Sequence, residues 1–444
     1  MSTRPFCTPG HSVAKDRRVS FVKPFEVLDS RGYPTIEVSL GLADGTVASV
    51  AVPAGASTGK YEAIESRDND TARYEGKGVL HAIANVTGII APALIGLMAD
   101  DQPAIDAVLL ELDGTEHKQR LGANAIVGTS LACARAAAQS HDVELYEYLG
   151  GHEAHVLPVP MFNVLNGGKH APDGSDIQEF KLVPLGASTF REALRFGAET
   201  YHALHDVLHD AGAPTTVGDE GGFAPSFASN SAYLDVLMQA IERAGYRPGE
   251  QIAIGLDPAA TTFFHNNEYV LHRDEHRLST DEMIDYWADW LKRYPIISLE
   301  DPLAEEDWDG FQLLTSRLGK RVQIIGDDIF VTNKKFLQRG IDTGCCNGIL
   351  IKPNQIGTVT ETLETAKIAQ QAGYACLVSH RSGETLDTSI ADLAVAINCG
   401  QIKSGAPARG ERVAKYNRLL HIEATLGGRA VFAGRAAFPR TIAA

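Results

Sequence analysis

The chain has 444 residues and a formal net charge of −16. Apolar residues make up 44% and charged residues 22%, an ordinary globular mixture that can bury a large core. The acidic balance disfavours binding to nucleic acid, which needs clustered Lys and Arg, and no apolar run is long enough to cross a membrane. The length exceeds that of one ordinary domain and predicts two.

The first residues and the cysteines indicate where the protein works. Residues 1–20 lack the apolar segment of a secretory signal, and Pro5, Pro9 and Gly10 disfavour an amphipathic helix. The six cysteines are scattered and form no C-x-x-C pair, which favours reduced thiols over a disulfide framework. We therefore expect a flexible tail at 1–20 and a cytoplasmic location.

Residues 21–150 mix strand and helix patterns, which predicts an α+β domain. The predicted elements are strands at 21–28, 35–41 and 47–53 and helices near 77–98, 101–110 and 122–140. After the third strand comes a loop of small residues, PAGASTGK. It lacks the first Gly and the final Ser or Thr of a phosphate-binding P-loop, so we interpret it as a mobile lid, with a plain surface turn as the alternative.

Residues 151–444 repeat short apolar runs, most of them ending in a polar or charged residue. Amphipathic segments such as 279–294 and 358–373 separate several of the runs. Buried parallel strands are apolar throughout, and in a barrel their carboxyl ends open onto the site of chemistry. We therefore expect a catalytic α/β barrel of the (β/α)8 type. The alternative, a doubly wound open sheet, would gather its functional residues at one switch point.

Three of the apolar runs end in acids: Asp257, Glu300 and Asp327. If the runs are neighbouring strands, the three carboxylates meet at the barrel mouth, where like charges raise each other's pKa. A hard divalent cation would relieve that repulsion, and oxygen ligands suit Mg²⁺. The alternative is three separate salt bridges, but no Arg stands beside each acid.

Two lysines, Lys352 and Lys403, also lie at the ends of apolar runs. A lysine beside a metal ion and another cation loses pKa and can act as a general base. The alternative is a surface lysine whose stem covers apolar neighbours.

A further run ends in Ser379, His380, Arg381 and Ser382. A guanidinium can bind a phosphate through two parallel hydrogen bonds, and the flanking hydroxyls can add to that contact. By itself such an Arg is more often a surface charge.

Several segments together resemble the enolase family. They include DSRGYPTIEV, VGDEGGFAP, SLEDPL, GDDIFVTN, ILIKPNQIGT and VSHRSGET, in the family's order from about Phe25 to residue 425. The resemblance implies an N-terminal α+β capping domain on a barrel, and a lyase that dehydrates 2-phospho-D-glycerate to phosphoenolpyruvate in glycolysis and gluconeogenesis. It also implies a homodimer or a larger homo-oligomer.

The resemblance implies two Mg²⁺ ions. Asp257, Glu300 and Asp327 would hold the first, and Ser57 in the predicted lid would hold the second, which binds with the substrate. Both ions would stabilise the negative charge that develops when a proton leaves the carbon next to a carboxylate.

The resemblance also implies catalytic and binding roles. Lys352 would take the C2 proton, while Glu220 with Glu179 would help the C3 hydroxyl leave, and His170 would lie near the phosphate and the leaving group. Arg381 and Ser382 would bind the phosphate, within the segment that also holds Ser379 and His380, and Lys403 would bind the substrate carboxylate.

The chain departs from the family pattern at a few positions. Ala54 stands where Ser is usual before GAST, Tyr33 replaces Asn after DSRG, and Thr261 and Thr262 follow the metal-binding Asp in place of the usual pair. These departures keep open an enolase-like enzyme of specialised metabolism, such as a carboxyphosphonoenolpyruvate synthase. A binding protein without activity is disfavoured, because every acid, base and predicted metal ligand is present.

Overall fold

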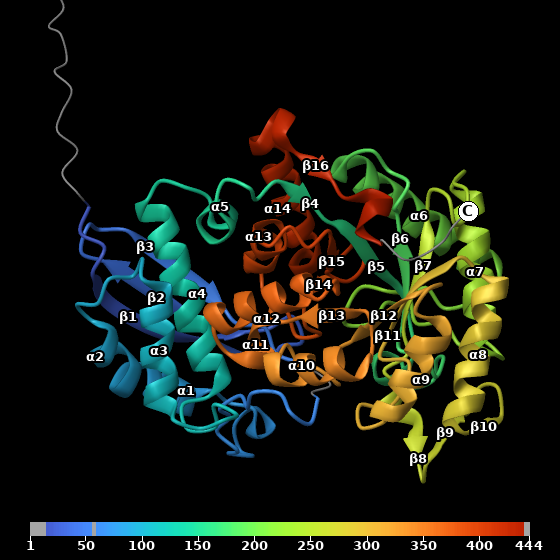
Figure 1. The fold of residues 1–444 in the computed structure, drawn as a ribbon, viewed down its shortest axis with the longest axis horizontal. Coiled ribbons are helices and arrows are strands. Elements are labelled where there is room, and N and C mark those ends of the chain that lie inside the picture. Colours follow the sequence, from blue (N-terminus) through green and yellow to red (C-terminus); the bar gives the residue numbers. More distant parts are fainter. Residues whose placement is uncertain (1–14, 56–58, 439–444) are drawn as a thin grey trace, which may run out of the picture.

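The computed structural model describes residues 15–55 and 59–438. An N-terminal part with a small sheet and several helices lies beside a closed barrel, and Figure 1 shows the first in blue and cyan and the second in green to red. The predicted capping domain on a barrel is confirmed. Most of the predicted tail, residues 1–20, lies outside the described residues, and its last two residues belong to the first strand.

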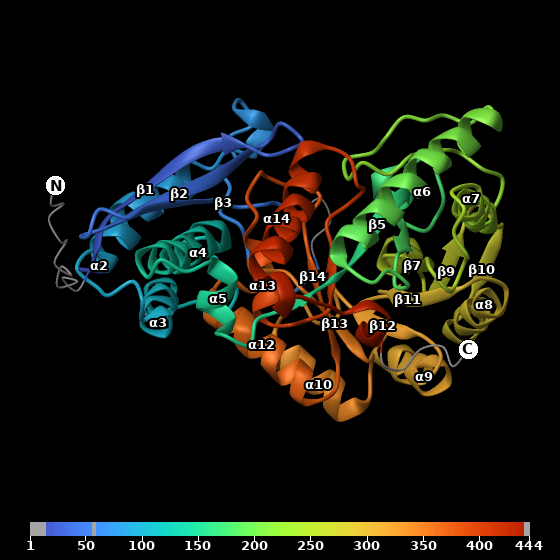
Figure 2. The ribbon, with the colours of Figure 1, turned by 90° about the horizontal axis from the view of Figure 1, so that it is seen from above.

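The N-terminal sheet is antiparallel, in the order β1-β2-β3. Its strands are β1 (Val19–Leu28), β2 (Pro34–Leu42) and β3 (Val47–Ala51). The helices are α1 (Leu80–Asn85), α2 (Ala91–Leu94), α3 (Gln102–Asp113), α4 (Ala123–Ser140) and α5 (Leu145–Gly150). Figure 2 shows α3 and α4 beneath one face of the sheet. In α4, Gly128 permits a close approach, because a Cβ there would lie 2.9 Å from Val52 Cγ2.

The segment predicted as one helix near 77–98 is interrupted. A single π-helical turn, η2 (Val86–Ile90), joins α1 to α2. Pro92 stands in the first turn of α2 and has no N–H to donate, so the regular helical hydrogen bonding cannot continue through it.

Eight strands close the barrel in the order β11-β12-β13-β14-β15-β5-β6-β7. Their bounds are β5 (Val159–Asn166), β6 (Glu179–Val183), β7 (Ala253–Asp257), β11 (Ile296–Glu300), β12 (Gln323–Gly326), β13 (Gly348–Ile351), β14 (Ala375–Ser379) and β15 (Gln401–Lys403). β6 runs antiparallel to both β5 and β7, which the expected repeat of parallel strands did not include. The first residue of β6 therefore lies at the same end of the barrel as the last residues of its neighbours.

Helices surround the barrel. They are α6 (Phe190–Asp210), α7 (Asn230–Arg243), α8 (Thr280–Arg293), α9 (Trp308–Leu318), α10 (Lys334–Thr343), α11 (Pro353–Ile356), α12 (Val359–Gln371), α13 (Ser389–Ala396) and α14 (Gly410–Leu426). Two helix starts follow from the sequence: Ser279 and Glu282 form a capping box on α8, and Thr358 caps α12. Smaller strands are β4 (Val156–Leu157), β8 (Phe264–His265), β9 (Glu268–Leu271), β10 (His276–Leu278) and β16 (Val431–Phe432).

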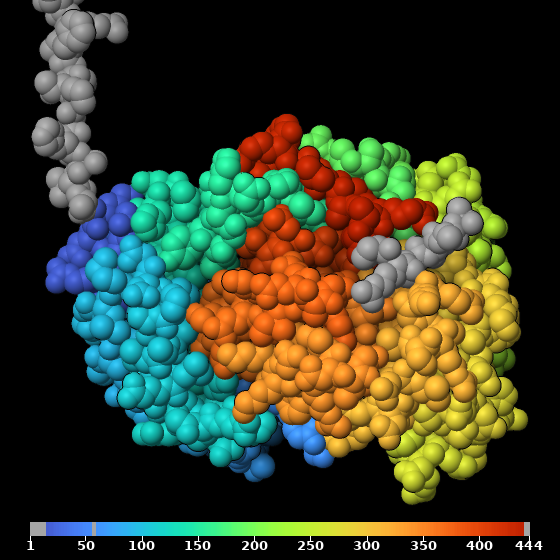
Figure 3. All heavy atoms as spheres, in the orientation of Figure 1, coloured from blue at the N-terminus to red at the C-terminus, as the bar shows by residue number. Residues whose placement is uncertain are grey.

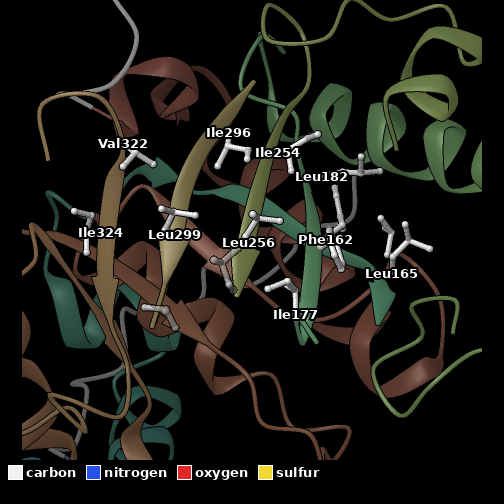
Figure 4. Packing of buried hydrophobic residues seen from close by; sticks show 14 of the residues in the cluster. Phe162, Leu165, Ile177, Leu182, Ile254, Leu256, Ile296, Leu299, Val322 and Ile324 are labelled. Carbon is white, nitrogen blue, oxygen red and sulfur yellow. The ribbon is translucent and has the colours of Figure 1, made fainter. Parts of the chain in front are cut away.

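Alternate residues of the barrel strands face two apolar regions. Outward-facing side chains such as Phe162, Leu182 and Leu256 pack with the surrounding helices in the main core (Figure 4). Inward-facing side chains, among them Met161 and Val183, fill the barrel interior in a separate cluster. The charged residues at the mouth therefore rest on an apolar floor.

The two parts of the chain are joined by partly buried polar contacts. Lys118 Nζ lies 2.8 Å from Glu361 Oε1, and Asp106 accepts a hydrogen bond of 2.9 Å from the backbone N–H of Thr360. Figure 3 shows the two parts in continuous surface contact. Among the helices of residues 15–55 and 59–438, none has the length and apolarity that a membrane crossing needs.

Candidate active site

Three buried carboxylates meet at the barrel mouth. Glu179, Asp257 and Glu300 each offer an oxygen within 4.8 Å of the others, and their exposed fractions are 2%, 4% and 0%. Asp257 and Glu300 end β7 and β11, as the apolar runs suggested, whereas Glu179 begins the antiparallel strand β6. Glu179 is the register partner of Asp257, so strand direction brings it into the group.

Lys403 stands among these three acids. Its ammonium nitrogen lies 2.5 Å from Glu300 Oε1, 3.3 Å from Glu179 Oε2 and 3.4 Å from Asp257 Oδ2. Burial and the charge of Glu300 raise the pKa of Asp257 well above its usual value. Burial opposes the charge of Lys403, but the three acids outweigh it and raise its pKa. The group thus holds concentrated negative charge that a cation stabilises.

Sequence reasoning missed a second ammonium in this group. Lys181 is fully buried, and its Nζ lies 2.5 Å from Glu300 Oε2 and 3.2 Å from Glu179 Oε2. The signal was present, because Lys181 follows Glu179 by two positions in a strand and so shares its face.

Asp327 belongs to a neighbouring acid group. The structure places it with Asp301 and Asp328, again with oxygens within 4.8 Å, and not in the first group. The Asp301 carboxylate accepts hydrogen bonds of 2.8 Å from the backbone N–H groups of Asp327 and Asp328. Burial and the charge of Asp327 raise the pKa of Asp328 to about 8.

Lys352 follows β13 directly and contacts this second group. Its Nζ lies 2.5 Å from Asp327 Oδ2. Burial is the largest single effect and lowers the pKa of Lys352, but the charges of Asp327 and Glu62 together outweigh it, so the net shift is upward. The strand order places Lys352 across the barrel from Glu179: β14, β15 and β5 separate β13 from β6 on one side, and β12, β11 and β7 on the other.

Glu220 forms a third polar group with two histidines. His380 Nε2 lies 3.3 Å from Glu220 Oε2, and His170 Nε2 lies 3.8 Å from Glu220 Oε1. Asn163 Nδ2 donates a hydrogen bond of 2.9 Å to the same carboxylate. Burial raises the pKa of Glu220, but the two histidines outweigh it and hold the pKa well below the usual value. Because His170, Glu220 and Glu179 also have ligand atoms within 4.8 Å, this group adjoins the acids of the mouth.

The local structure around Glu220 is a loop and not a strand. Glu220 lies in the loop between α6 and α7, where a single bridge joins Val217 to Phe223. Gly221 has φ 85°, a conformation that disfavours a continuous strand.

The segment 379–382 forms one wall of the site. Ser382 Oγ lies 3.2 Å from Glu220 Oε1 and 3.3 Å from His170 Nε2. The Ser379 hydroxyl instead donates to the backbone carbonyl of His380. Arg381 is 4% exposed and its guanidinium is held by Glu62, at 2.9 and 3.1 Å.

Glu62 and Gln355 are further residues that sequence reasoning missed. Gln355 Nε2 donates to Glu62 Oε1 at 3.2 Å and to Asp327 Oδ1 at 2.9 Å. Glu62 also accepts from the backbone N–H of Gly59 at 3.0 Å. These bonds connect Arg381 to Asp327 through the N-terminal part. Ser57, the remaining predicted metal ligand, lies outside the described residues.

The donor atoms of both acid groups suit a hard divalent cation. Each group offers three carboxylate oxygens in close proximity, and Mg²⁺ and Ca²⁺ prefer oxygen ligands. The residues present therefore fit a metal ion, although the three acids that the sequence assigned to one site, Asp257, Glu300 and Asp327, fall in two neighbouring groups.

Comparison with known proteins agrees with this geometry. A family model described as "Enolase, N-terminal domain" matches residues 19–149, and one described as "Enolase, C-terminal TIM barrel domain" matches residues 154–441. A protein named Enolase from Acidothermus cellulolyticus is 58% identical over 415 residues, which cover 94% of this chain and 96% of that relative. Both parts of the fold, and the barrel whose mouth carries the buried acids, are thus matched, and the chain belongs to the enolase family.

Proposed function

We propose that this chain is a Mg²⁺-dependent hydro-lyase that converts 2-phospho-D-glycerate to phosphoenolpyruvate. The observation that carries the proposal is the position of Lys352 across the barrel from Glu179, which adjoins Glu220 and His170. A substrate bound between these walls meets an amine on one face and a group of acids on the other. That arrangement suits removal of a proton from one carbon and of hydroxide from the next.

In this proposal Lys352 takes the C2 proton, and Glu220 with Glu179 assists departure of the C3 hydroxyl as water. The intermediate carries extra negative charge on the substrate carboxylate, and Lys403, fixed among Glu179, Asp257 and Glu300, places a positive charge there. Preorganised charge of this kind costs no reorganisation during the reaction.

The metal sites belong to the same proposal. Asp257 and Glu300 of the first acid group, with Asp327 of the neighbouring group, would hold a first Mg²⁺, and a second ion would bind with the substrate. When bound, the ions supply positive charge to the developing enolate. Support comes from the two groups of carboxylate oxygens.

The phosphate would be bound by Arg381 and Ser382, with His380 and His170 beside them. Support comes from burial and proximity: Ser382 Oγ is within 3.3 Å of His170 Nε2, and the Arg381 guanidinium is held in one orientation by Glu62. A guanidinium that is already held in one orientation loses little side-chain freedom when it binds a phosphate.

A spectrophotometric assay tests the proposal. Phosphoenolpyruvate should form from 2-phospho-D-glycerate with MgCl₂, and EDTA should stop the reaction. Very slow turnover with both metal and substrate present would contradict the proposal and favour the carboxyphosphonoenolpyruvate synthase alternative.

We also propose that the protein is a cytoplasmic homodimer or larger homo-oligomer. Leu28 and Leu386 line one surface cavity of about 490 Å³ and are 57% and 71% exposed, an arrangement that favours a protein partner. Light scattering coupled to gel filtration gives the test, and a monomeric mass would contradict it.

A further inference from the structure

A buried cation lies beneath the acid group of the mouth, and the reaction as described leaves it without a role. Lys181 has no exposed surface and is among the largest fully buried side chains of the described residues. Burying an ammonium is costly unless it is paired, so a residue of this kind requires compensating carboxylates. Its two partners are Glu179 and Glu300, at 3.2 and 2.5 Å.

The neighbouring strand of the barrel leaves room for the Lys181 side chain. Lys181, Gly255 and Ser298 are register partners on β6, β7 and β11. A Cβ on Gly255 would lie 3.5 Å from Lys181 Cβ and 2.9 Å from Met161 Cε. The glycine therefore leaves β7 without a side chain between Lys181 and Glu300, and the lysine stem lies above the apolar floor formed by Met161 and its neighbours.

Each of the two ammonium groups contacts a different oxygen of the Glu300 carboxylate. Lys181 lies 2.5 Å from Oε2, and Lys403 lies 2.5 Å from Oε1. Lys403 is the residue proposed to place its charge on the substrate carboxylate, so a bound substrate would share that ammonium with Oε1. Lys181 approaches Glu300 from the apolar side of the group. Among the described residues its only acidic partners are Glu300 and Glu179, so its hydrogen bond to Glu300 Oε2 is kept.

The charges lead to the same conclusion. Glu179, Asp257 and Glu300 bring three carboxyl groups into a buried group, and Lys181 and Lys403 bring two ammonium groups. A divalent ion therefore enters a group that is already largely compensated.

We propose that Lys181 is a positioning residue that holds Glu300 as a one-oxygen metal ligand and weakens the resting affinity of the site for Mg²⁺. It stabilises the metal-free acids, and its charge repels the incoming ion. Binding of the ion then depends more strongly on the anionic substrate, which adds negative charge. This inference rests on the metal site proposed above.

Titration calorimetry with MgCl₂ on EDTA-treated protein, without substrate, tests the inference. Lys181→Met replaces the ammonium with an apolar, unbranched side chain that fits the same space. We expect the variant to bind Mg²⁺ at least about tenfold more tightly, because it lacks a positive charge within a few ångströms of the site. We also expect the metal-free variant to unfold at a lower temperature and to gain more from Mg²⁺ than the unsubstituted protein.

A matched control and a second variant separate charge from packing. Val183→Ala changes the same strand and the same barrel interior without a change of charge, so it should lower the unfolding temperature and leave the Mg²⁺ affinity unchanged. Lys181→Gln keeps an N–H donor near Glu300 and loses the charge, so it should bind Mg²⁺ more tightly even if Lys181→Met does not fold.

The outcomes distinguish the two proposals. If neither the unsubstituted protein nor any Lys181 variant that folds binds Mg²⁺, the proposed metal site is wrong. If the unsubstituted protein binds Mg²⁺, and each Lys181 variant that folds binds Mg²⁺ equally tightly or more weakly, the metal site stands and the role of Lys181 is overturned. An equal gain in Val183→Ala would also overturn it, because packing would then explain the change.

Discussion

Glu62, in the N-terminal part of the chain, holds Arg381 of the barrel by two hydrogen bonds, from Nη1 to Oε2 at 2.9 Å and from Nη2 to Oε1 at 3.1 Å. The two side chains are 7% and 3% exposed, so water competes little for either. Asn354 Oδ1 accepts a third bond from Arg381 at 3.0 Å. The capping domain thus fixes the guanidinium that the proposed reaction uses for phosphate.

We expect Glu62→Gln to raise the KM for 2-phospho-D-glycerate about tenfold, because a charge-assisted hydrogen bond contributes roughly 1.5–3 kcal/mol and the amide can accept through only one atom. The kcat should fall less, since the proton-transfer groups are unchanged. Steady-state kinetics measure both. Glu306→Gln is the control: it removes an exposed ion pair with Lys60 and should change neither constant. A fall in kcat with an unchanged KM would contradict the phosphate role.

Lys352→Ala should abolish exchange of the C2 proton with solvent, because the variant loses the amine that is proposed to take this proton. Asp327 keeps its hydrogen bond of 2.9 Å from Gln355, so the fold and the acid group should persist. Proton NMR of the substrate in D₂O follows the exchange. Lys334→Ala, which removes an exposed lysine paired with Glu364, should exchange normally. Retained exchange in Lys352→Ala would remove Lys352 as the base.

Glu220→Gln should separate the two halves of the reaction. It should slow loss of the C3 hydroxyl by roughly 10²–10⁴-fold, the usual contribution of a general acid or base, and leave C2 proton exchange measurable. The amide is close in shape, so contacts with Asn163 and Ser382 can persist in part. Combined product assay and NMR exchange give the test. Equal loss of both steps would show that Glu220 acts elsewhere.

Removal of metal should lower stability as well as stop the reaction. A ligand at 100 times its Kd stabilises the folded state by about 2.7 kcal/mol, so EDTA should lower the unfolding temperature and MgCl₂ should restore it. Thermal unfolding with and without MgCl₂ measures the difference. Asp257→Asn removes one oxygen ligand and should respond less to MgCl₂. An unfolding temperature that is insensitive to Mg²⁺ would contradict metal binding in the absence of substrate.

The sequence predicted the residues whose position depends on local pattern. Asp257, Glu300 and Lys403 end their strands and Lys352 follows its strand directly, because a buried parallel strand is a continuous apolar run that the charged residue closes. Segment 379–382 was located in the same way. The barrel and its capping domain followed from these repeats and from the family resemblance.

The positions of the residues that were missed depend on strand direction or on contacts between segments that are far apart in the sequence. Nothing in the five residues of β6 indicates that the strand runs antiparallel, and Lys181 was overlooked. Glu62 and Arg381 are 319 positions apart and belong to different domains, and no local periodicity relates them. Pairings of this kind are set by how the domains pack.

That packing can be tested at Gly150, the last residue of α5, where the capping domain meets the barrel. A Cβ at this position would lie 2.1 Å from the backbone carbonyl oxygen of Ala396 in α13, and a backbone atom cannot rotate away. We expect Gly150→Ala to lower the free energy of unfolding by about 1–3 kcal/mol, as overpacking does. Gly88→Ala is the control, because its Cβ would meet nothing within 4 Å and helical alanine is favoured by roughly 0.5–1 kcal/mol. Urea unfolding of both variants should therefore give changes of opposite sign, and an unchanged midpoint for Gly150→Ala would mean that α5 and α13 can separate without cost.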